Sequence, residues 1–435
     1  MNNLIAIVGR PNVGKSTMFN RLTETKDAII DPTSGTTRDR KYGRAEWSGR
    51  TFTVIDTGGW ITKSDDAFES AIRAQVQISL EEAAVILFMV DGQTGLTDLD
   101  EDIARIIRRS DKPVILACNK VDTSAHDLLT GEFYRLGLDS EVWPVSGSSG
   151  YGTGDFLDAV IALLPSVGDN EDSGLPKFSV VGRPNVGKST LINTLVGKQR
   201  NIVTDIAGTT RDSVHTHFNL YGFDFELIDT AGLRRKKQIE DQLEFYSTVR
   251  TIRSIEQSDV CLLLLDAQNG MERQDQSIFW QIVNSYRGVV ILVNKWDLID
   301  KDHQTMGEFE AAIRERIEPF TDVPILFTSN LTKQRILKAF ESAMEVYENR
   351  SHRIPTSQLN DFLLPIMKNQ PPPMYKGKMV RIKYVTQITS QTPTFAFYCN
   401  LPQYVKEPYK RFLENHIRSE WNLTGVTIRL FFREK

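Results

Sequence analysis

The sequence predicts an α/β protein with two repeated domains, each a mostly parallel sheet covered by helices on both faces, followed by a small α+β domain. Three observations predict this fold. The segment GRPNVGKST occurs at residues 9–17 and again, letter for letter, at 182–190. Short apolar runs alternate with longer amphipathic stretches, which is typical of strands alternating with helices. Beyond residue 350, basic and aromatic residues become frequent.

The repeat extends well beyond this first segment. GTTRD at 35–39 returns at 208–212, DTGG at 56–59 returns as DTAG at 229–232, and NKVD at 119–122 returns as NKWD at 294–297. Four motifs in the same order at nearly constant spacing indicate two copies of one domain. We therefore expect a first domain over 1–166, an acidic flexible linker over 167–175, a second domain over 176–350 and a basic C-terminal domain over 351–435.

The expected elements follow the apolar pattern. In the first copy, we expect strands at Leu4–Val8, Phe52–Ile55, Val85–Val90 and Val114–Cys118, and helices at Ser16–Leu22, Ala67–Leu80, Asp98–Arg109 and Gly154–Leu164. In the C-terminal domain, we expect strands at Lys378–Gln387, Thr394–Asn400 and Thr427–Phe432, and a helix at Lys406–Trp421. The alternation in the repeats implies parallel sheets, and the tail implies an α+β domain.

The composition is that of an ordinary globular protein, since 40% of the 435 residues are apolar and 25% are charged. It excludes disorder of the whole chain and a collagen-like protein. No apolar run approaches the roughly 20 residues of a membrane span, and Leu4–Val8 is too short for the core of a signal peptide. Cys118, Cys261 and Cys399 each lie in an apolar run, which favours buried thiols in a reducing cytoplasm.

The charge is unevenly distributed along the chain. The formal net charge is −4, but residues 351–435 contain 13 Lys and Arg against 5 Asp and Glu, a charge of +8. The first 350 residues therefore carry −12. This asymmetry favours contact with nucleic acid through one part of the molecule.

The first shared segment matches the phosphate-binding loop G-x-x-x-x-G-K-S, and it follows a strand and opens a helix in both copies. Backbone amides and the helix N-terminus of such a loop face the phosphates, the lysine reaches the outer phosphates, and the serine hydroxyl binds Mg²⁺. The expected residues are Gly9, Arg10, Pro11, Asn12, Val13, Gly14, Lys15 and Ser16, and then Gly182, Arg183, Pro184, Asn185, Val186, Gly187, Lys188 and Ser189.

The D-x-x-G motif follows an apolar strand in each copy, so its aspartate lies at the end of the sheet where α/β proteins bind ligands. There Asp56 or Asp229 can hold Mg²⁺ through water, and the amide of Gly59 or Gly232 can sense the γ-phosphate. The whole motifs are Asp56, Thr57, Gly58, Gly59 and Trp60, and Asp229, Thr230, Ala231, Gly232 and Leu233.

A threonine pair lies between the first helix and the second strand of each copy. Such a loop can close a threonine onto Mg²⁺ only when the γ-phosphate is present, which makes it a switch. Of each pair we favour the second residue, Thr37 and Thr210, on motif position alone. The predicted metal ligands are thus Ser16, Thr37, Asp56, Ser189, Thr210 and Asp229.

The motifs NKVD and NKWD predict that the base is guanine. The carboxylate of Asp122 or Asp297 can accept both the ring N–H and the exocyclic amine of guanine, whereas adenine mismatches this pattern. Because an unsatisfied buried group costs about 1 to 3 kcal/mol, such a site should reject ATP. Asn119 and Asn294 either fix the loop or contact the purine edge, and Lys120 and Lys295 lay their stems over the base. Val121 and Trp296 complete the motifs, and Ser146 and Ser329 occupy a further base-contacting loop.

Together these residues resemble the translation-factor-related GTPases. Two such domains followed by a basic segment with MVRIKYVTQ and YKRFLENHIR are similar to the bacterial tandem GTPase family called EngA or Der, across essentially the whole chain. The resemblance implies a KH-like C-terminal domain and a cytoplasmic, Mg-dependent GTP hydrolase that binds GTP and GDP. It also implies a role in assembly of the large (50S) ribosomal subunit, through RNA and protein contacts with ribosomal particles. We expect a monomer.

One departure from Ras-like enzymes concerns hydrolysis. The residue after D-x-x-G, often a water-orienting Gln, is Trp60 or Leu233, and neither can hydrogen-bond a water in that role. In similar GTPases the asparagine of the phosphate-binding loop helps to hold a potassium ion, so Asn12 and Asn185 are candidates for potassium-stimulated catalysis. The other catalytic candidates are Lys15, Lys188, Thr37 and Thr210. The alternative is that each asparagine only stabilises its loop.

RNA contact is expected at two places. The run Arg234, Arg235, Lys236, Lys237 follows the second D-x-x-G and either meets RNA or is a solvated surface. The C-terminal domain combines basic and aromatic residues, but residues 351–435 contain no G-x-x-G loop, and many of the aromatics are more simply explained as core residues. A GTP-dependent switch is the leading hypothesis. An RNA-modification factor, a non-hydrolysing scaffold and a membrane GTPase are the alternatives.

Overall fold

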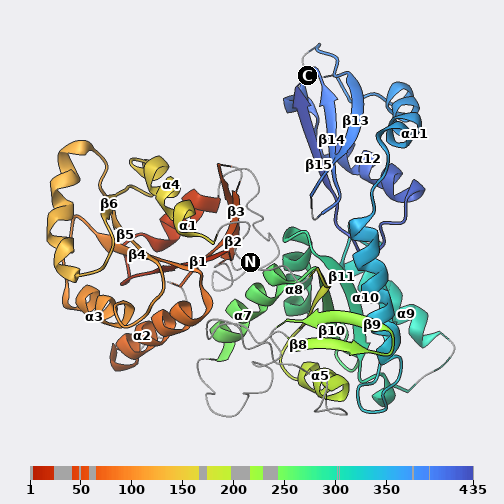
Figure 1. Cartoon of the computed structure of the whole chain (residues 1–435), viewed down its shortest axis with the longest axis horizontal. Helices are drawn as coiled ribbons and strands as arrows, with labels where there is room; N and C mark the ends of the chain where they lie inside the picture. Colours follow the sequence, from red (N-terminus) through yellow and green to blue (C-terminus); the bar gives the residue numbers. More distant parts are fainter. Residues whose placement is uncertain are drawn as a thin grey trace. The chain divides into compact units, whose positions relative to one another are not determined.

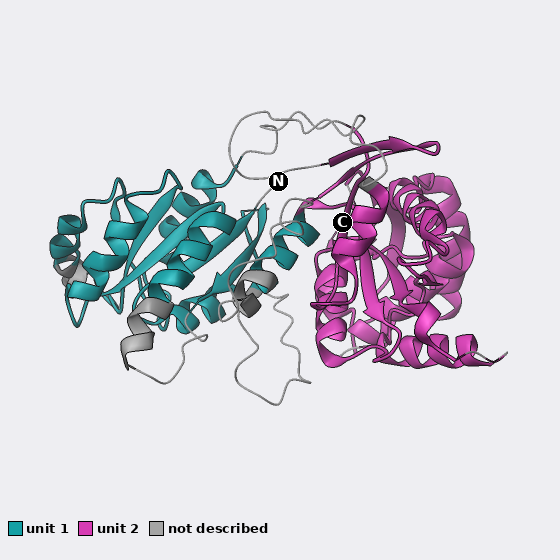
Figure 2. Ribbon diagram, turned by 90° about the horizontal axis from the view of Figure 1, so that it is seen from below, with its two compact units in different colours: residues 1–172, 237–256 teal, residues 173–236, 257–435 magenta. Residues whose placement is uncertain are grey.

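The computed structural model describes residues 3–23, 42–48, 50–57, 65–165, 174–196, 216–228, 243–300, 302, 304–374, 377–390 and 392–434. The chain forms two compact units (Figure 2). The first comprises residues 1–172 and 237–256, and the second comprises residues 173–236 and 257–435.

The first unit is built on a six-stranded sheet with the order β2-β3-β1-β4-β5-β6 (Figure 1). The strands are β1 (Leu4–Val8), β2 (Tyr42–Trp47), β3 (Arg50–Asp56), β4 (Val85–Asp91), β5 (Val114–Asn119) and β6 (Val142–Pro144). Only β2 is antiparallel to its neighbour. Since β3 and β4 flank β1 on opposite sides, the connections change direction at the C-terminal end of β1, which is where open α/β sheets bind ligands.

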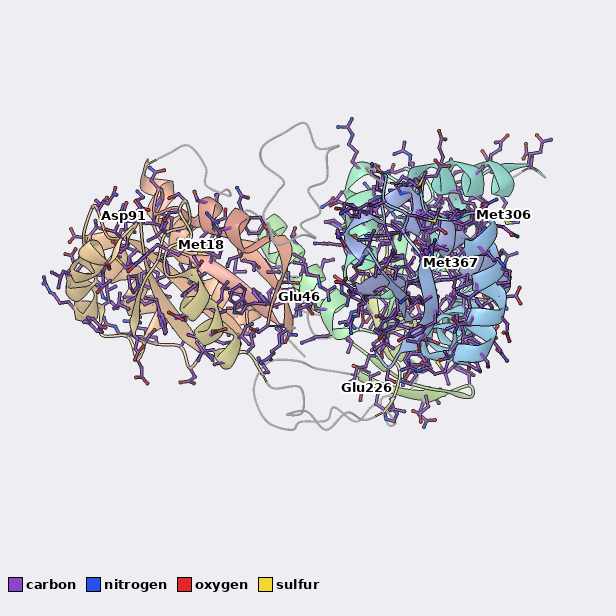
Figure 3. All side chains as sticks on the ribbon, turned by 90° about the horizontal axis from the view of Figure 1, so that it is seen from above. Met18, Glu46, Asp91, Glu226, Met306 and Met367 are labelled. Atoms are coloured by element: carbon purple, nitrogen blue, oxygen red, sulfur yellow. The ribbon has the colours of Figure 1, made fainter. Side chains whose placement is uncertain are left out.

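Helices cover both faces of this sheet. They are α1 (Lys15–Thr23), α2 (Asp65–Glu82), α3 (Asp98–Ile107), η1 (Ser124–Leu136) and α4 (Thr153–Leu163). Alternate side chains of β1 lie in two different cores, because successive residues of a strand point to opposite faces. Ile5 and Ile7 pack with α1 and α4, whereas Ala6 and Val8 pack with α2, α3 and η1. Met18 points from α1 into the first of these cores (Figure 3).

Helix α7 (Leu243–Gln257) is part of the first unit although it follows the second D-x-x-G motif in the sequence. Its Val249 and Ile252 lie in one buried cluster with Leu4, Ile55 and Ile78. Arg253 Nη1 also donates to Glu82 Oε2 of α2 at 3.0 Å. The second repeat thus contributes a helix to the core of the first unit.

The second unit repeats the sheet, with the order β12-β11-β10-β7-β9-β8. Its strands are β7 (Lys177–Val181), β8 (Thr216–Leu220), β9 (Phe223–Leu227), β10 (Val260–Asp266), β11 (Gly288–Asn294) and β12 (Ile325–Phe327). The helices are α5 (Lys188–Val196), α8 (Arg273–Asn284), η2 (Trp296–Leu298), α9 (Thr305–Arg316) and α10 (Ile336–Ser351). Again only one neighbouring pair, β8 with β9, is antiparallel.

The C-terminal segment folds as a three-stranded sheet with helices. It contains α11 (Thr356–Asn369), β13 (Ile382–Ile388), β14 (Thr394–Cys399), η3 (Pro402–Tyr404), α12 (Glu407–Glu420) and β15 (Arg429–Glu434). β13 and β14 are antiparallel, and β14 and β15 are parallel. Phe395 and Phe397 are fully buried in its core, as one of the interpretations of the aromatics predicts. Gly425 joins this segment to the second sheet through Val289 N–H, which donates to its carbonyl at 2.8 Å.

The predicted fold class is confirmed: two six-stranded, mostly parallel sheets with helices and a small α+β segment. The three cysteines are buried and free, in β5, β10 and β14. Burial raises the pKa of the Cys118 thiol to about 12. Within the described ranges, no helix is both long and apolar enough to cross a membrane.

Candidate nucleotide-binding sites

The phosphate-binding loop of each repeat connects a central strand to a helix. In the first unit it runs from β1 into α1, and Lys15 folds back so that Nζ donates to the carbonyls of Gly9 and Arg10, both at 2.7 Å. In the second unit Lys188 Nζ donates to Gly182 O at 2.6 Å and to Arg183 O. Each ammonium is therefore bonded to the first two carbonyls of its own loop.

The loops have an unusual backbone that glycine and asparagine tolerate. Gly14 has φ +93°, and a Cβ there would lie 2.2 Å from Asn119 Nδ2. Gly187 repeats this arrangement, with φ +106° and a distance of 2.3 Å to Asn294 Nδ2. Asn12 and Asn185 both have φ 65°, in the left-handed region where Asn is among the few tolerated residues.

The asparagine of N-K-x-D hydrogen-bonds its own loop to the phosphate loop and to the loop that contains Gly147 or Asn330. In the first unit Asn119 Nδ2 donates to Val13 O at 2.7 Å, and its Oδ1 accepts from Gly147 N at 2.9 Å. In the second, Asn294 Nδ2 donates to Val186 O at 2.8 Å, and Oδ1 accepts from Asn330 N at 3.1 Å. Of the two predicted roles, the geometry supports fixing the loop.

The base-binding side of the first site is open and polar. Asp122 is exposed, and its Oδ1 accepts hydrogen bonds from Ser146 Oγ at 2.6 Å and Ser149 Oγ at 3.3 Å. A cavity of about 250 Å³ lies here, lined by Gly14, Thr17, Gln93, Asn119, Lys120, Asp122 and Ser148. The structure thus brings together the phosphate loop and the N-K-x-D motif around one cavity.

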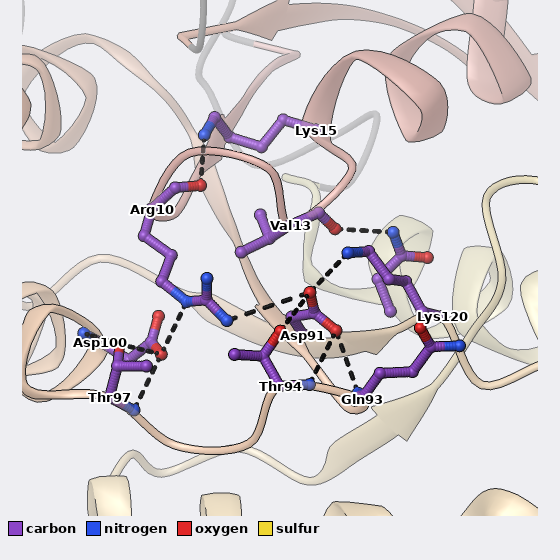
Figure 4. Close-up of polar contacts among 10 residues, drawn as sticks. Arg10, Val13, Lys15, Asp91, Gln93, Thr94, Thr97, Asp100 and Lys120 are labelled. Atoms are coloured by element: carbon purple, nitrogen blue, oxygen red, sulfur yellow. Dashed lines mark hydrogen bonds and ion pairs between the residues drawn. The ribbon is translucent and has the colours of Figure 1, made fainter.

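The lysine of N-K-x-D is tied to the end of the neighbouring strand. Lys120 Nζ donates to Asp91 Oδ2 at 2.5 Å, and Asp91 ends β4 (Figure 4). Lys295 Nζ makes the same bond to Asp266 Oδ2, at the end of β10. Burial alone would raise the pKa of Asp91, but hydrogen bonds from Lys120 and Thr94 outweigh it and lower the pKa below its usual value.

Two predicted metal ligands meet in the first site. Ser16 Oγ donates to Asp56 Oδ2 at 2.6 Å, although the two residues come from α1 and the end of β3. Asp56 is almost completely buried, and the next residue, Thr57, donates to Ile7 O at 2.8 Å, which fixes the end of the strand. A hydroxyl and a carboxylate are the oxygen donors that Mg²⁺ prefers, so these two residues fit the ion.

The second base-binding loop is braced differently. Ser329 is buried and its Oγ accepts from Thr332 N at 3.1 Å, as Ser146 Oγ accepts from Ser149 N at 3.0 Å in the first loop. The difference lies at the next residue. Asn330 Nδ2 donates to Gly187 O at 3.0 Å, so its side chain reaches the phosphate loop. Trp296 is a core side chain that packs on Phe327, with ring centroids 4.4 Å apart, and Val121 is likewise buried.

Known protein families match three segments of the chain. Residues 4–120 and 177–295 match the family described as 50S ribosome-binding GTPase, and residues 353–433 match the KH-domain-like C-terminal region of EngA bacterial GTPase enzymes. The chain is 56% identical to the GTPase Der of Christiangramia forsetii and 55% identical to that of Bacteroides thetaiotaomicron, with 100% of each chain covered. The chain belongs to the EngA/Der family of GTPases.

Membership of the EngA/Der family confirms the predictions of two GTPase domains, guanine-nucleotide binding and a KH-like C-terminal domain. Among solved structures, the chain is similar to a single-residue variant of Aquifex aeolicus Era bound to GDP.AlF4-, with 22% identity and a TM-score of 0.32 over 79% of this chain and 100% of that one. A score this low supports no conclusion about this chain.

Several predicted EngA/Der site residues lie outside the described residues. They are Thr37, Gly58, Gly59, Trp60, Thr210, Asp229, Thr230, Ala231, Gly232 and Leu233, together with the basic run Arg234, Arg235, Lys236 and Lys237. Pro11 and Pro184 lie in their loops, and Ser189 follows Lys188 at the start of α5.

The structure also reveals site residues that the motifs do not identify. Thr17, Gln93 and Ser148 line the cavity of the first site. Thr17 directly follows the phosphate-loop serine, and Ser148 is two residues beyond Ser146, so proximity to a motif was the available signal. Gln93 follows β4 and has no motif of its own; only the pairing of β4 with β5 brings it there.

Proposed function

We propose that this GTPase is a two-site, GTP-hydrolysing switch of the cytoplasm that acts in assembly of the large, 50S ribosomal subunit by associating with ribosomal particles in a nucleotide-dependent way. The observation that carries the proposal is that both repeats match a family described as 50S ribosome-binding GTPase, each with its own lysine, serine and N-K-x-D motif. The domain boundaries and site residues predicted from the sequence are part of the same proposal.

We assign Mg²⁺ to the residues whose hydroxyl and carboxylate oxygens suit this ion. In the first site Ser16 and Asp56 would hold the ion, with Thr37 completing the set when GTP is bound. Ser189, Thr210 and Asp229 have the same roles in the second site by sequence. When bound, the ion neutralises charge on the outer phosphates. The chain's own contribution is the position of Ser16 Oγ, which Asp56 fixes.

We assign K⁺ binding to Asn12 and Asn185. The bound ion would supply part of the charge stabilisation during hydrolysis. Asn12 is exposed and has φ 65°, so its side chain is available while its backbone already suits asparagine or glycine. This backbone also gives physical support to the alternative role in loop stabilisation. Asn12→Gly separates the two roles, because glycine keeps the left-handed backbone and removes the amide oxygen.

In the Asn12→Gly/Asn185→Gly double variant, we expect GTP hydrolysis to lose most of its acceleration by potassium over sodium, while GDP affinity stays within about threefold. Steady-state phosphate release in matched potassium and sodium buffers measures the first quantity, and equilibrium GDP binding measures the second. Equal potassium acceleration in the variant and the wild type would contradict the assignment and leave only the loop role.

We assign RNA contact to the basic C-terminal domain. Its exposed cations include Lys378, Arg381, Lys383, Lys406, Arg411 and Arg433. Tyr384 and Tyr398 are stacked on adjacent strands with ring centroids 4.4 Å apart, and both are half-buried. Phosphate contact through the cations is therefore the expected mode, with little sequence-specific reading of bases. We propose that the protein acts as a monomer.

The experiment that tests the switch is sedimentation of the full chain with ribosomal subunits under a GTP analogue, GDP or no nucleotide. Lys15→Ala and Lys188→Ala disable one site at a time and are matched controls for each other. We expect association with the large subunit to depend on nucleotide and to change in at least one of the two variants. Association that is the same under all nucleotides, or that favours the small subunit, would overturn the proposal.

A further inference from the structure

The arginine of each phosphate loop faces away from the lysine of the same loop. It contacts the start of the helix that follows a neighbouring strand of the sheet, β4 in the first unit and β10 in the second. Arg10 Nε donates to Asp100 Oδ2 of α3 at 3.2 Å, across 90 residues of sequence (Figure 4). In the second unit Arg183 Nε donates to Asp275 Oδ2 of α8 at 2.8 Å. Both aspartates have 0% exposed surface. The same long-range contact is thus made in both repeats.

The surroundings of the two pairs differ. Asp100 also accepts from its N-cap residue, Thr97, whose Oγ1 lies 2.7 Å from Asp100 Oδ2, and Arg10 Nη2 forms a longer ion pair with Asp91 Oδ2 at 4.0 Å. In the second unit the N-cap residue is Glu272, which adds an ion pair to Arg183 Nη1 at 2.5 Å. Since the capping residue changes and the Arg–Asp bond does not, the pair is the common element of the two arrangements.

Keeping charged groups in these buried Arg–Asp pairs is energetically unfavourable. Among the described residues, Asp100 Oδ1 and Asp275 Oδ1 have no hydrogen-bond partner, and neither do Arg10 Nη2 and Arg183 Nη2. Burial raises the pKa of Asp100 and of Asp275, despite the hydrogen bonds from their N-cap residues and arginines. Buried ion pairs of this kind contribute little net stability, so another reason for the pair is needed.

That reason lies in the backbone of the arginine. Arg10 O accepts from Lys15 Nζ, so the residue that is anchored by its side chain also holds the phosphate-loop lysine through its carbonyl. Arg183 O does the same for Lys188. Two residues further on, Asn12 and Asn185 have the left-handed φ that such a loop must sustain. An anchor on Arg10 and Arg183 fixes this part of the loop before nucleotide binds.

We infer that Asp100 and Asp275 are positioning residues for phosphate binding, which act by holding Arg10 and Arg183 and, through their carbonyls, the loop lysines. The inference rests on the nucleotide sites described above. It requires that removing either member of a pair lowers the affinity for the phosphates, because both members contribute to the bond that anchors the loop. It also requires that the lost binding affinity comes from the phosphate that the loop lysine reaches. Binding of the base and the stability of the fold should change little.

The test uses the full chain with its second site disabled by Lys188→Ala. In this parent, equilibrium binding of GDP and of GMP is measured for Arg10→Met, Asp100→Ala and the double variant. GMP lacks the β-phosphate and therefore reports binding at the base and α-phosphate. We expect each single variant to lose tenfold or more in GDP affinity with GMP affinity within about twofold, and the double variant to be no weaker than the weaker single variant.

Two further variants separate positioning from helix capping. Asp100→Asn keeps an oxygen acceptor for Arg10 Nε and should recover most of the GDP affinity. Thr97→Val removes the cap hydroxyl but leaves the Arg10 contact, and it should leave the ratio of GDP to GMP affinity unchanged. Arg183→Met and Asp275→Ala in a Lys15→Ala parent should reproduce the result at the second site.

Additive losses in the double variant, an equal loss for GMP, or an equal effect of Thr97→Val would overturn the inference. If the parent itself bound no GDP, the assignment of the nucleotide site would fail instead, so the two failures are distinguishable. Thermal unfolding of each variant shows whether the chain is folded, and the GDP to GMP ratio remains informative for a folded but destabilised variant.

Discussion

The phosphate sides of the two sites are nearly identical, whereas their base sides are not. Lys15 and Lys188 make the same pair of carbonyl contacts, and a Cβ added at Gly14 or Gly187 would overlap the N-K-x-D asparagine at almost the same distance. On the base side, Ser146 donates to Asp122 in the first site, whereas Asn330 reaches the phosphate loop in the second. The comparison teaches that phosphate chemistry restricts the backbone more tightly than base recognition restricts the surrounding loop.

The largest expected effect tests the claim that the phosphate sides are equivalent. Gly14→Ala and Gly187→Ala should each lower GDP affinity at their own site by about a hundredfold or more, because the added Cβ overlaps Asn119 or Asn294 and the φ values of +93° and +106° are unfavourable for alanine. Equilibrium GDP binding at each site measures this. Gly131→Ala and Gly307→Ala, where a Cβ meets nothing within 4 Å, are matched controls. Losses that differ by more than tenfold between the sites would break the equivalence.

A smaller effect is expected where the second site has an extra brace. Asn330 Nδ2 donates to Gly187 O, whereas the first repeat has Gly147 at this place, whose backbone N–H contacts Asn119. Asn330→Gly should therefore lower GDP affinity at the second site by roughly 2- to 10-fold, which corresponds to one net hydrogen bond. Leu331→Ala, at an exposed neighbour, is the control. An unchanged affinity would mean that the brace does not stabilise the binding loop.

A comparable test applies to the first site. Ser146→Ala removes the donor to Asp122 Oδ1 and should lower GDP affinity by about fivefold, since the carboxylate loses one orienting hydrogen bond. Ser329→Ala at the second site should have less than about a twofold effect. Both serine hydroxyls accept a backbone N–H within their own loops, but among the described contacts only Ser146 donates to the aspartate of N-K-x-D. Fluorescence titration with labelled GDP resolves these differences. Equal losses would show that both serines serve the base in the same way.

Much of the site could be predicted from the sequence because its chemistry depends on short motifs. The loops of Lys15, Ser16 and Asn119 each follow an apolar strand, and parallel strands end at one edge of a sheet. That argument alone predicts the meeting of Ser16 with Asp56 and of Asn119 with the phosphate loop, and the structure brings both pairs within hydrogen-bond distance. The alternation of apolar runs predicted the sheets for the same reason.

What could not be predicted depends on contacts between distant residues. Asp100 lies in the segment TDLDED, which is typical of a helix N-terminus, and nothing in that segment indicates a bond to Arg10. Helix α7 is similar: its apolar residues predict a buried face but not which sheet covers it, and Val249 and Ile252 pack in the first unit. Residue types and the spacing of apolar residues specify a helix or strand. Which other part of the chain it contacts is determined by tertiary packing.

The smallest expected effect is a pH dependence of stability that compares the two buried carboxylates. Burial raises the pKa of Asp100 and Asp275 above 3.8, so the folded protein keeps these protons to a higher pH than the unfolded chain. Their contribution to stability is therefore present below pH 3.8 and is lost as the pH rises through the raised pKa. Asp100→Asn and Asp275→Asn should remove this loss, so that the free energy of unfolding of each variant rises relative to the wild type as the pH increases above 3.8. Urea unfolding at several pH values measures the trend. The opposite slope would mean that the charges of Arg10 and Arg183 outweigh burial at these positions.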